Sequence, residues 1–213
     1  MGLNEFKNVA VIVAHPDDET LWAGGTLLSN PAWNVFILSL CRGSDRDRAP
    51  KFAQALKEFG ARGIMGDLDD GPMQQSLNQE EVEELIVDLL PVRKYDLIIT
   101  HHPNGEYTRH LRHEETGKAV INMWQYGSIA ASELWCFAYE DGGREYLPKA
   151  VKTADIVNTL DKSTWERKYK LITATYGFDE NSWEARTTPA TEGFWKFTNQ
   201  KLATQWLGSL SKP

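Results

Sequence analysis

The stretch that most constrains the fold lies near the start of the chain, where an apolar strand runs directly into a turn crowded with charge. Residues 8–14 are rich in β-branched side chains and predict a buried strand. The turn that follows, residues 14–19 (AHPDDE), holds one imidazole and three carboxylates. In a parallel α/β sheet, ligands bind in the loops just past the carboxyl ends of the strands. Like charges this close together are unfavourable unless a cation lies among them, so this stretch predicts a metal site.

The remainder of the chain alternates between short apolar runs and longer segments with helical spacing. Strands are expected at residues 8–14, 34–41, 62–68, 95–100, 133–139 and 154–159, and helices at residues 20–29, 48–59, 78–90, 111–126, 164–176 and 192–207. Strands that alternate with helices indicate βαβ units around a mostly parallel sheet, which is the α/β class. No internal repeat and no linker is evident, so we expect one domain over residues 1–213.

Composition argues against several classes of protein. The formal net charge of the 213 residues is −7 and there is no basic stripe, so nucleic acid is not an expected partner. No apolar stretch is long enough to span a membrane. The first seven residues are polar, unlike a secretory signal, and the two cysteines, Cys41 and Cys136, lie in apolar runs, as is typical of reduced residues. We therefore expect a cytoplasmic protein; its oligomeric state, homo-oligomers included, is left open.

A catalytic zinc site usually takes three protein ligands and keeps one position open. His15 and Asp18 are three residues apart in the charged turn, a spacing that lets both point toward one cation. The third ligand is expected from the loop after the strand at 95–100, which holds four of the five histidines: His101, His102, His110 and His113. Both loops follow the carboxyl ends of predicted strands, so in a parallel sheet they should lie along the same edge.

Two short motifs resemble the signatures of a known enzyme family. Residues 14–19 (AHPDDE) look like the first signature of the PIG-L/LmbE superfamily of zinc-dependent N-deacetylases. Residues 110–113 (HLRH) resemble its second signature, a His-x-x-His near mid-chain. The order and separation of the motifs, and the strand before each, are similar to the family along most of the chain. The resemblance implies a Rossmann-like three-layer sandwich with the LmbE-like deacetylase fold.

The same resemblance implies a role for each residue of the two motifs. His15, Asp18 and His113 would bind Zn²⁺, and Asp17 would be the general base that takes a proton from the zinc-activated water. His110 would stabilise the oxyanion or protonate the amine leaving group. The reaction implied is removal of the N-acetyl group from an N-acetylglucosamine-type sugar or glycoconjugate. Such chemistry suits these residue types, because zinc lowers the pKa of water to about 7 and a neighbouring carboxylate can serve as base.

Residues that contact the sugar carry over from the family less directly. An arginine about a dozen residues before the glycine that ends the second helix matches Arg48, with Arg42 and Arg46 as rivals. The alternative for all three is an ion pair with a neighbouring acid. An acid in the loop after the third strand is expected to share the contact, which makes Asp70 or Asp69 the candidate.

The second motif departs from the family in spacing and in content. Tyr107 resembles a tyrosine that assists the oxyanion, but two residues, Thr108 and Arg109, separate it from His110, where related sequences have one. Many members have Pro-Asp between the two histidines, where this chain has Leu-Arg. The positive charges of Arg109 and Arg112 beside the pocket predict an anionic substrate, such as a phosphorylated or carboxylated sugar.

Other interpretations remain open at this stage. The enzyme could instead cleave a larger sugar-linked amide of the thiol-conjugate type, or the chain could be a non-catalytic sugar-binding relative, although a binder has no use for the base Asp17. A nucleotide-binding Rossmann protein is disfavoured, because no G-x-G-x-x-G follows the first strand. Iron could replace zinc. Four tryptophans in the last quarter of the chain could stack on sugar rings or fill the core: Trp165, Trp183, Trp195 and Trp206.

Overall fold

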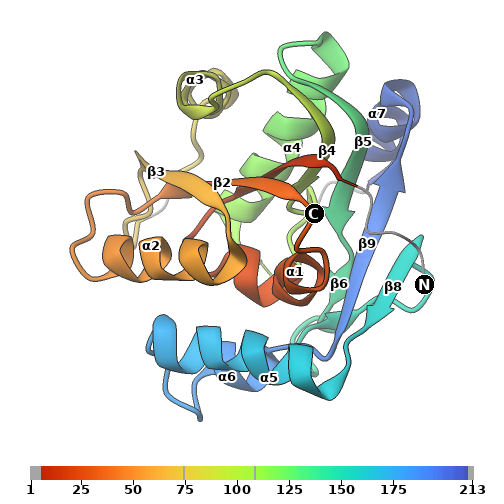
Figure 1. Ribbon diagram of the computed structural model, residues 1–213. Helices are drawn as coiled ribbons and strands as arrows, with labels where there is room; N and C mark the ends of the chain where they lie inside the picture. Colours follow the sequence, from red (N-terminus) through yellow and green to blue (C-terminus); the bar gives the residue numbers. More distant parts are fainter. Residues whose placement is uncertain (1–5, 74, 108, 211–213) are drawn as a thin grey trace.

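A seven-stranded sheet runs through the middle of the molecule (Figure 1). The computed structural model describes residues 6–73, 75–107 and 109–210. The strands of the sheet are β1 (Asn8–Val13), β2 (Asn34–Cys41), β3 (Arg62–Leu68), β4 (Lys94–Thr100), β5 (Ala130–Phe137), β8 (Ile156–Thr159) and β9 (Thr191–Phe197). Their order is β3-β2-β1-β4-β5-β9-β8. Strands β1 to β5 pair in parallel, whereas β9 is antiparallel to β5 and β8 to β9. The mostly parallel sheet confirms the predicted α/β class.

Helices cover both faces of the sheet. Below it in Figure 1 lie α1 (Asp18–Ser29), α2 (Arg48–Phe59), α5 (Lys162–Lys170) with the π-helix η1 (Leu171–Thr175) that continues it, and α6 (Trp183–Thr187). Above it lie α3 (Gln79–Leu89), α4 (Leu111–Tyr126) and α7 (Gln200–Ser209). A short hairpin of β6 (Tyr139–Glu140) and β7 (Lys149–Ala150) stands apart from the main sheet. The predicted three-layer sandwich is therefore present.

Strand β1 shows why the sheet needs helices on both sides. Val9, Val11 and Val13 pack on the α1 and α2 side, and Ala10 and Ile12 pack on the α3 and α4 side. All five are completely buried. A central parallel strand reads as one continuous apolar run because side chains on both of its faces are covered.

Local signals fix several of the helix ends as the sequence predicts. The Asn78 side chain accepts a hydrogen bond from the Glu80 backbone N–H at 3.2 Å and so caps α3. Gly60, with φ 64°, ends α2 in the left-handed conformation that favours glycine. Strands β2 and β3 and helices α2 and α4 have the predicted bounds.

The two adjacent glycines of α1 serve close packing. A Cβ atom on Gly25 would lie 2.3 Å from the Leu160 side chain, and one on Gly24 would lie 3.4 Å from the stem of Lys168. Helix α1 therefore contacts the C-terminal part of the chain more closely than any larger residue at position 25 would allow.

The prediction of a final helix over residues 192–207 is wrong at its start. Residues 191–197 form strand β9, and the helix α7 begins only after the cap residue Asn199. Phe194 packs on one face of the sheet and Trp195 and Phe197 on the other, which is a period of two rather than 3.6. The aromatic residues favour a strand, and pairing with β5 decides the outcome.

Two further expectations need adjustment, and one helix is new. The strand expected at 133–139 begins at Ala130 and ends at Phe137, and the helix expected at 164–176 changes into the π-helix η1 after Lys170. Helix α6 was not predicted from the sequence.

Two predictions fall on residues outside the described part of the chain. These are residues 1–5, which are most of the stretch judged to be no secretory signal, and Thr108 in the second motif. In the part of the chain that the structure describes, no helix is both long and apolar enough to cross a membrane.

Candidate metal and active site

The neighbouring parallel strands β1 and β4 bring the two predicted loops together. Residues Ile12 of β1 and Thr100 of β4 are paired, so both strands end at the same edge of the sheet. Just beyond, the backbone N–H of Ala14 donates to Nε2 of His101 at 3.0 Å and joins the two loops directly. His15 lies in the first loop, Asp18 begins α1, and His113 lies in the first turn of α4.

His15, Asp18 and His113 point one atom each toward a common position. His15 Nδ1 lies 3.1 Å from Asp18 Oδ2 and 3.2 Å from His113 Nε2, and the latter two atoms are 3.2 Å apart. Ligand atoms about 2.0–2.1 Å from a tetrahedral zinc are roughly 3.3 Å from one another. The three atoms form a nearly equilateral triangle of that size, so the donor set fits a tetrahedral metal ion with one position left open.

Carboxylates hold the far side of both imidazoles. Asp70 Oδ1 lies 3.1 Å from His15 Nε2, and Glu106 Oε2 lies 2.6 Å from His113 Nδ1. When the outer N–H donates to a carboxylate, the inner nitrogen keeps its lone pair for the metal. Sequence reasoning missed Glu106 in this role. An acid in the loop between a strand and a His-x-x-His motif is the signal that could have found it.

His101 forms a second cluster with Asp18 and His113, and all three are buried. Its Nδ1 lies 3.0 Å from the same Glu106 oxygen that binds His113, and its Nε2 accepts the Ala14 N–H. Because both ring nitrogens already have partners in the protein, His101 supports the site better than it could bind a metal.

Asp17 lines the same pocket as the triangle. Its Oδ2 accepts a hydrogen bond from Arg48 Nη1 at 3.2 Å. Burial, and then the charge of Asp18, raise the pKa of Asp17 well above its usual value, while Arg48 acts in the opposite direction. Burial would also raise the pKa of Asp18, but the charges of His113 and then His101 hold it well below its usual value. The two neighbouring carboxylates therefore sit in different electrostatic environments.

His110 and Tyr107 also line the pocket. The ring of His110 lies 4.6 Å from that of His15 and 4.4 Å from that of His113. Burial, and then the charges of His113 and His15, lower the pKa of His110 to about 3. Burial also raises the pKa of the Tyr107 hydroxyl, which therefore keeps its proton.

These residues line one pocket of about 330 Å³ at the carboxyl edge of the sheet. All eight predicted site residues contribute to it: His15, Asp17, Asp18, Arg48, Asp70, Tyr107, His110 and His113. Arg42 lines it as well, with its guanidinium on Asp70 at 2.9 Å, whereas Arg46, its fellow rival for the sugar contact, is exposed and outside the pocket.

Comparison with known proteins identifies the family. Residues 10–124, just over half of the chain, match the family model described as PIG-L: GlcNAc-PI de-N-acetylase. The chain belongs to the PIG-L family. This confirms the family membership that the two motifs predicted. A relative from Acanthamoeba polyphaga mimivirus, described as an uncharacterized protein, is 24% identical over 189 residues, with 80% of each chain covered.

Solved structures with the same fold include two deacetylases. The A40926 pseudoaglycone deacetylase Dbv21 has a TM-score of 0.60 at 15% identity and covers 90% of this chain and 97% of its own. The zinc-inhibited form of the teicoplanin deacetylase Orf2 has a TM-score of 0.59 at 15% identity, with 89% and 97% covered. The conserved protein TT1542 from Thermus thermophilus has a TM-score of 0.63 at 16% identity, with 89% and 94% covered.

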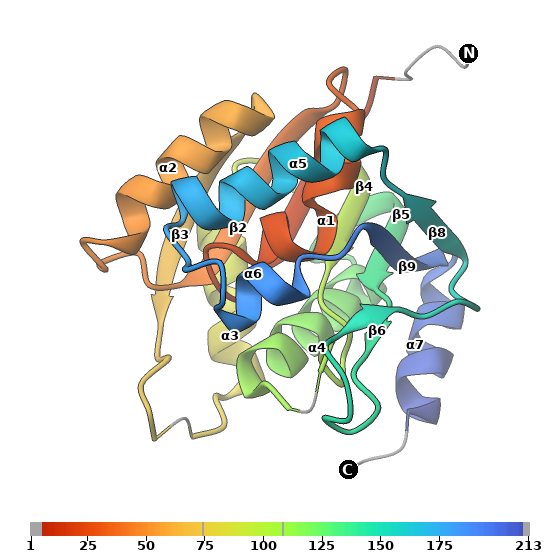
Figure 2. The ribbon, with the colours of Figure 1, turned by 90° about the horizontal axis from the view of Figure 1, so that it is seen from below.

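One wall of the pocket comes from outside the part of the chain that matches the PIG-L family model. Helix α6 lies beside the start of α1 (Figure 2) and contributes Trp183 and Glu184 to the pocket. The Trp183 ring lies 4.7 Å from that of Tyr107. The sequence named Trp183 only as one of four tryptophans, and no local motif distinguished it. The other three pack elsewhere: Trp165 on Tyr169, and Trp195 and Trp206 against the core on the α7 side.

The prediction that Arg109 and Arg112 add positive charge beside the pocket is wrong for both residues. Arg112 is 1% exposed, and its guanidinium binds Glu115 and the carbonyl oxygens of Asp69 and Gln75. It ties α4 to the loop after β3. Arg109 forms a bidentate ion pair with Glu114, at 3.0 Å for each bond, and does not line the pocket. Neither arginine is free to bind a substrate anion.

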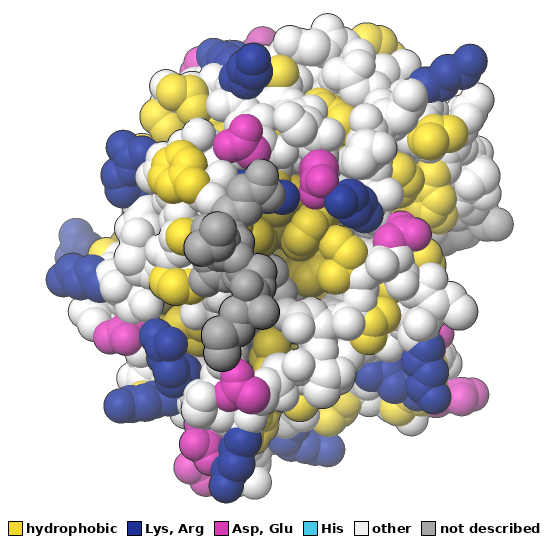
Figure 3. All heavy atoms as spheres, turned by 45° about the vertical axis from the view of Figure 1, so that its right-hand side comes forward, with side chains coloured by type: hydrophobic (Ala, Val, Ile, Leu, Met, Phe, Trp, Pro, Cys, Tyr) yellow, Lys and Arg dark blue, Asp and Glu magenta, His cyan; other side chains and the backbone are white. Residues whose placement is uncertain are grey.

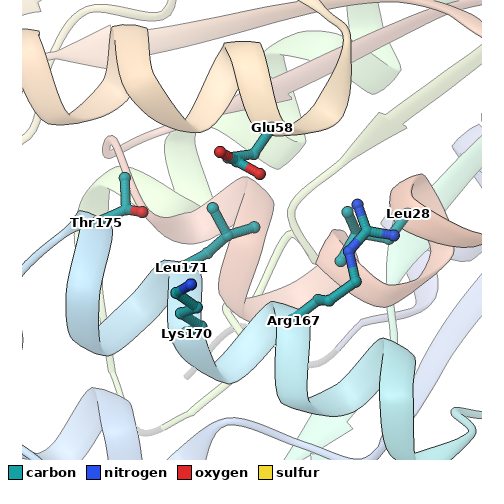
Figure 4. A pocket seen from close by; sticks show the side chains of 6 residues that line it. All are labelled: Leu28, Glu58, Arg167, Lys170, Leu171 and Thr175. Atoms are coloured by element: carbon teal, nitrogen blue, oxygen red, sulfur yellow. The ribbon is translucent and has the colours of Figure 1, made fainter.

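The part of the chain that the structure describes has other hollows, lined by different groups. A smaller hollow of about 220 Å³ lies between α1, α2 and α5, where Glu58 stands opposite Arg167 and Lys170 (Figure 4). The face shown in Figure 3 carries acidic and basic side chains scattered around apolar groups, and no described histidine is visible on it.

Proposed function

We propose that this chain is a zinc-dependent hydrolase that removes the N-acetyl group from an N-acetylglucosamine-type sugar or glycoconjugate. One observation carries the proposal: three metal-binding atoms 3.1–3.2 Å apart stand beside the half-buried carboxylate of Asp17 in an open pocket. The description of the family as a GlcNAc-PI de-N-acetylase supports the substrate class. Two neighbours of the same fold are named as deacetylases, which is consistent with it.

The residues divide the work as follows. Zinc held by His15, Asp18 and His113 would lower the pKa of water and polarise the amide carbonyl. Asp17 takes the proton from the attacking water and returns it to the amine nitrogen as the C–N bond breaks; its raised pKa makes it a stronger base than an ordinary carboxylate. His110, neutral because its pKa is low, donates its N–H to the developing oxyanion.

We expect residues at the rim of the pocket to contact the substrate. Arg48 is 24% exposed at its side chain and can donate to sugar hydroxyls while still bound to Asp17. Tyr107 and Trp183 present aromatic surface to the pocket, which suits the apolar face of a sugar ring. Asp70, placed between His15 and Arg42, supports a metal ligand as well as lining the pocket.

The alternatives keep the same site. A larger sugar-linked amide would use the same metal and base, and the open rim would accept its extra groups. A non-catalytic sugar-binding relative would need neither Asp17 nor the metal triangle.

We also propose one domain over residues 1–213, since β9 and β8 complete the sheet begun by the N-terminal strands. We further propose a cytoplasmic location, since Cys41 and Cys136 are buried and unpaired.

Amine release from a panel of N-acyl sugars tests the proposal. The zinc-loaded protein should release free amine from N-acetylglucosamine derivatives, and Asp17→Asn should lower kcat by roughly 10²–10⁴-fold while zinc content stays near one per chain. Asp47→Asn is the matched control, because Asp47 is an exposed acid that pairs with Lys51 outside the pocket. A panel with no turnover, or an Asp17→Asn variant as active as the control, would contradict the proposal.

A further inference from the structure

Glu19, the last acid of the charged turn, is completely buried and does not face the pocket. Its Oε1 accepts hydrogen bonds from the hydroxyls of Thr20 and Tyr176, both at 2.6 Å. Its Oε2 accepts the backbone N–H of Asp17 at 3.0 Å. The Glu19 carboxylate therefore joins the base of the proposed reaction to a tyrosine that lies 157 residues after Glu19 in the chain.

Asp17 needs such a support because its backbone is strained. Its φ of 132° and ψ of −27° lie in a region that residues other than glycine rarely adopt. Such conformations persist when the surrounding structure fixes them, and they cluster at functional sites. Here the Asp17 carbonyl oxygen accepts the N–H groups of Thr20 and Leu21 in the first turn of α1, and the Glu19 carboxylate accepts the Asp17 N–H. The peptide groups before and after the Asp17 Cα are therefore both held by hydrogen bonds.

Tyr176 supplies the outer end of this support from a π-helix. The residue follows η1, and its ring is 1% exposed against the core on the α1 side. Single-turn π-helices are rare and are often found at functional sites. In this chain, η1 directs the Tyr176 hydroxyl toward α1 from the C-terminal segment, outside the part that matches the family model.

We propose that Tyr176, acting through Glu19, is a positioning residue for Asp17. The hydroxyls of Tyr176 and Thr20 hold the Glu19 carboxylate, and the carboxylate holds the strained Asp17 peptide in the orientation that aims the side chain at the attacking water. The inference rests on the proposed function for the identity of Asp17 as the base. The hydrogen bonds that join Tyr176, Glu19 and Asp17 do not depend on that function.

Two conservative substitutions test the inference on the full-length, zinc-loaded protein. Tyr176→Phe removes only the hydroxyl that binds Glu19. Tyr139→Phe is the matched control, because Tyr139 is also buried and its hydroxyl also binds α1, at the carbonyl oxygen of Trp22 at 2.7 Å. Hydrogen exchange of the amides of residues 14–21 is measured together with kcat and KM for a hydrolysed N-acetylglucosamine derivative.

Tyr176→Phe should speed exchange of the Asp17 amide and lower kcat by about 10-fold or more, with KM and zinc content unchanged. Tyr139→Phe should change neither reading. Equal behaviour of the two variants would overturn the inference, as would faster exchange with an unchanged kcat. If the wild type hydrolyses nothing, the proposed function fails, while the exchange comparison still decides whether Tyr176 holds Asp17. Thr20→Val removes the other donor to the same oxygen, and it decides the matter should Tyr176→Phe fold poorly.

Discussion

The buried ion pair between Lys168 and Glu192 offers the sharpest prediction about stability. Both side chains are completely buried, with Lys168 Nζ 2.7 Å from Glu192 Oε1. The Glu192 carboxylate also accepts the backbone N–H groups of Gly25 and Thr26, both at 2.7 Å, and the Thr26 hydroxyl at 2.6 Å. Four donors from α1 and α5 thus meet one carboxylate of β9.

Lys168→Met keeps the apolar stem that packs on Gly24 and removes the ammonium group, with its bonds to Glu192 and to the Pro189 carbonyl oxygen. The variant leaves a buried carboxylate without its cation, and loss of one partner of a buried pair costs about 3–5 kcal/mol. Lys162→Met is the control on the same helix, because Lys162 and Glu166 are an exposed pair, 3.6 Å apart, that should contribute about 0–1 kcal/mol. Urea unfolding at pH 7, with an unchanged m value, measures both free energies.

The double variant Lys168→Met with Glu192→Gln adds a stricter test. Replacing Glu192 by Gln removes the uncompensated charge and leaves about one mismatched hydrogen bond, which costs about 1–3 kcal/mol. The double variant should therefore be more stable than Lys168→Met alone. Should Lys168→Met cost no more than Lys162→Met, or the two substitutions simply add, our account of this pair would be refuted.

Three other outcomes are expected. Gly117→Ala should destabilise the protein by about 1–3 kcal/mol and weaken zinc binding, because its Cβ would lie 2.6 Å from the His101 carbonyl oxygen and push away the helix that carries His113. Gly63→Ala is the control on β3, where the new Cβ would lie 2.5 Å from the Ile37 carbonyl oxygen of β2. It should cost stability without weakening zinc binding, and equal zinc affinities of the two variants would contradict this. Trp183→Ala should raise KM roughly tenfold with kcat nearly unchanged, whereas Trp165→Ala should not, and a fall in kcat alone would argue against a substrate contact. Zinc at about a thousand times its Kd should stabilise the protein by about 4 kcal/mol in thermal unfolding, and a Tm insensitive to zinc and chelator would count against the metal site.

Much of the fold and the metal triangle could be predicted because their causes are local. A β-branched run followed by an acidic turn identifies β1 and its loop, and the spacing of His15 and Asp18 indicates that both can bind one cation. The parallel pairing of β1 with β4 then brings His113 to the same edge, as the rule for strand ends predicts.

The remainder depends on contacts between distant parts of the chain. Residues 192–197 were predicted to be helical; their aromatic residues favour a strand, but only the pairing with β5 decides the outcome. Arg112 follows His110 by two residues and was expected beside it, but successive positions on a helix point in different directions, and this one meets Glu115 and the loop after β3. Trp183 joins the pocket only because α6 folds back against α1.

The origin of the pocket wall has an evolutionary consequence. The proposed base and metal ligands lie within residues 15–113, whereas Trp183 and Glu184 arrive from a five-residue helix near the end of the chain. Replacement or lengthening of that helix changes the surface offered to a substrate and leaves the ligands untouched. Selection can therefore alter substrate recognition almost independently of the proposed metal ligands and base. Relatives with the same ligands need not share a substrate.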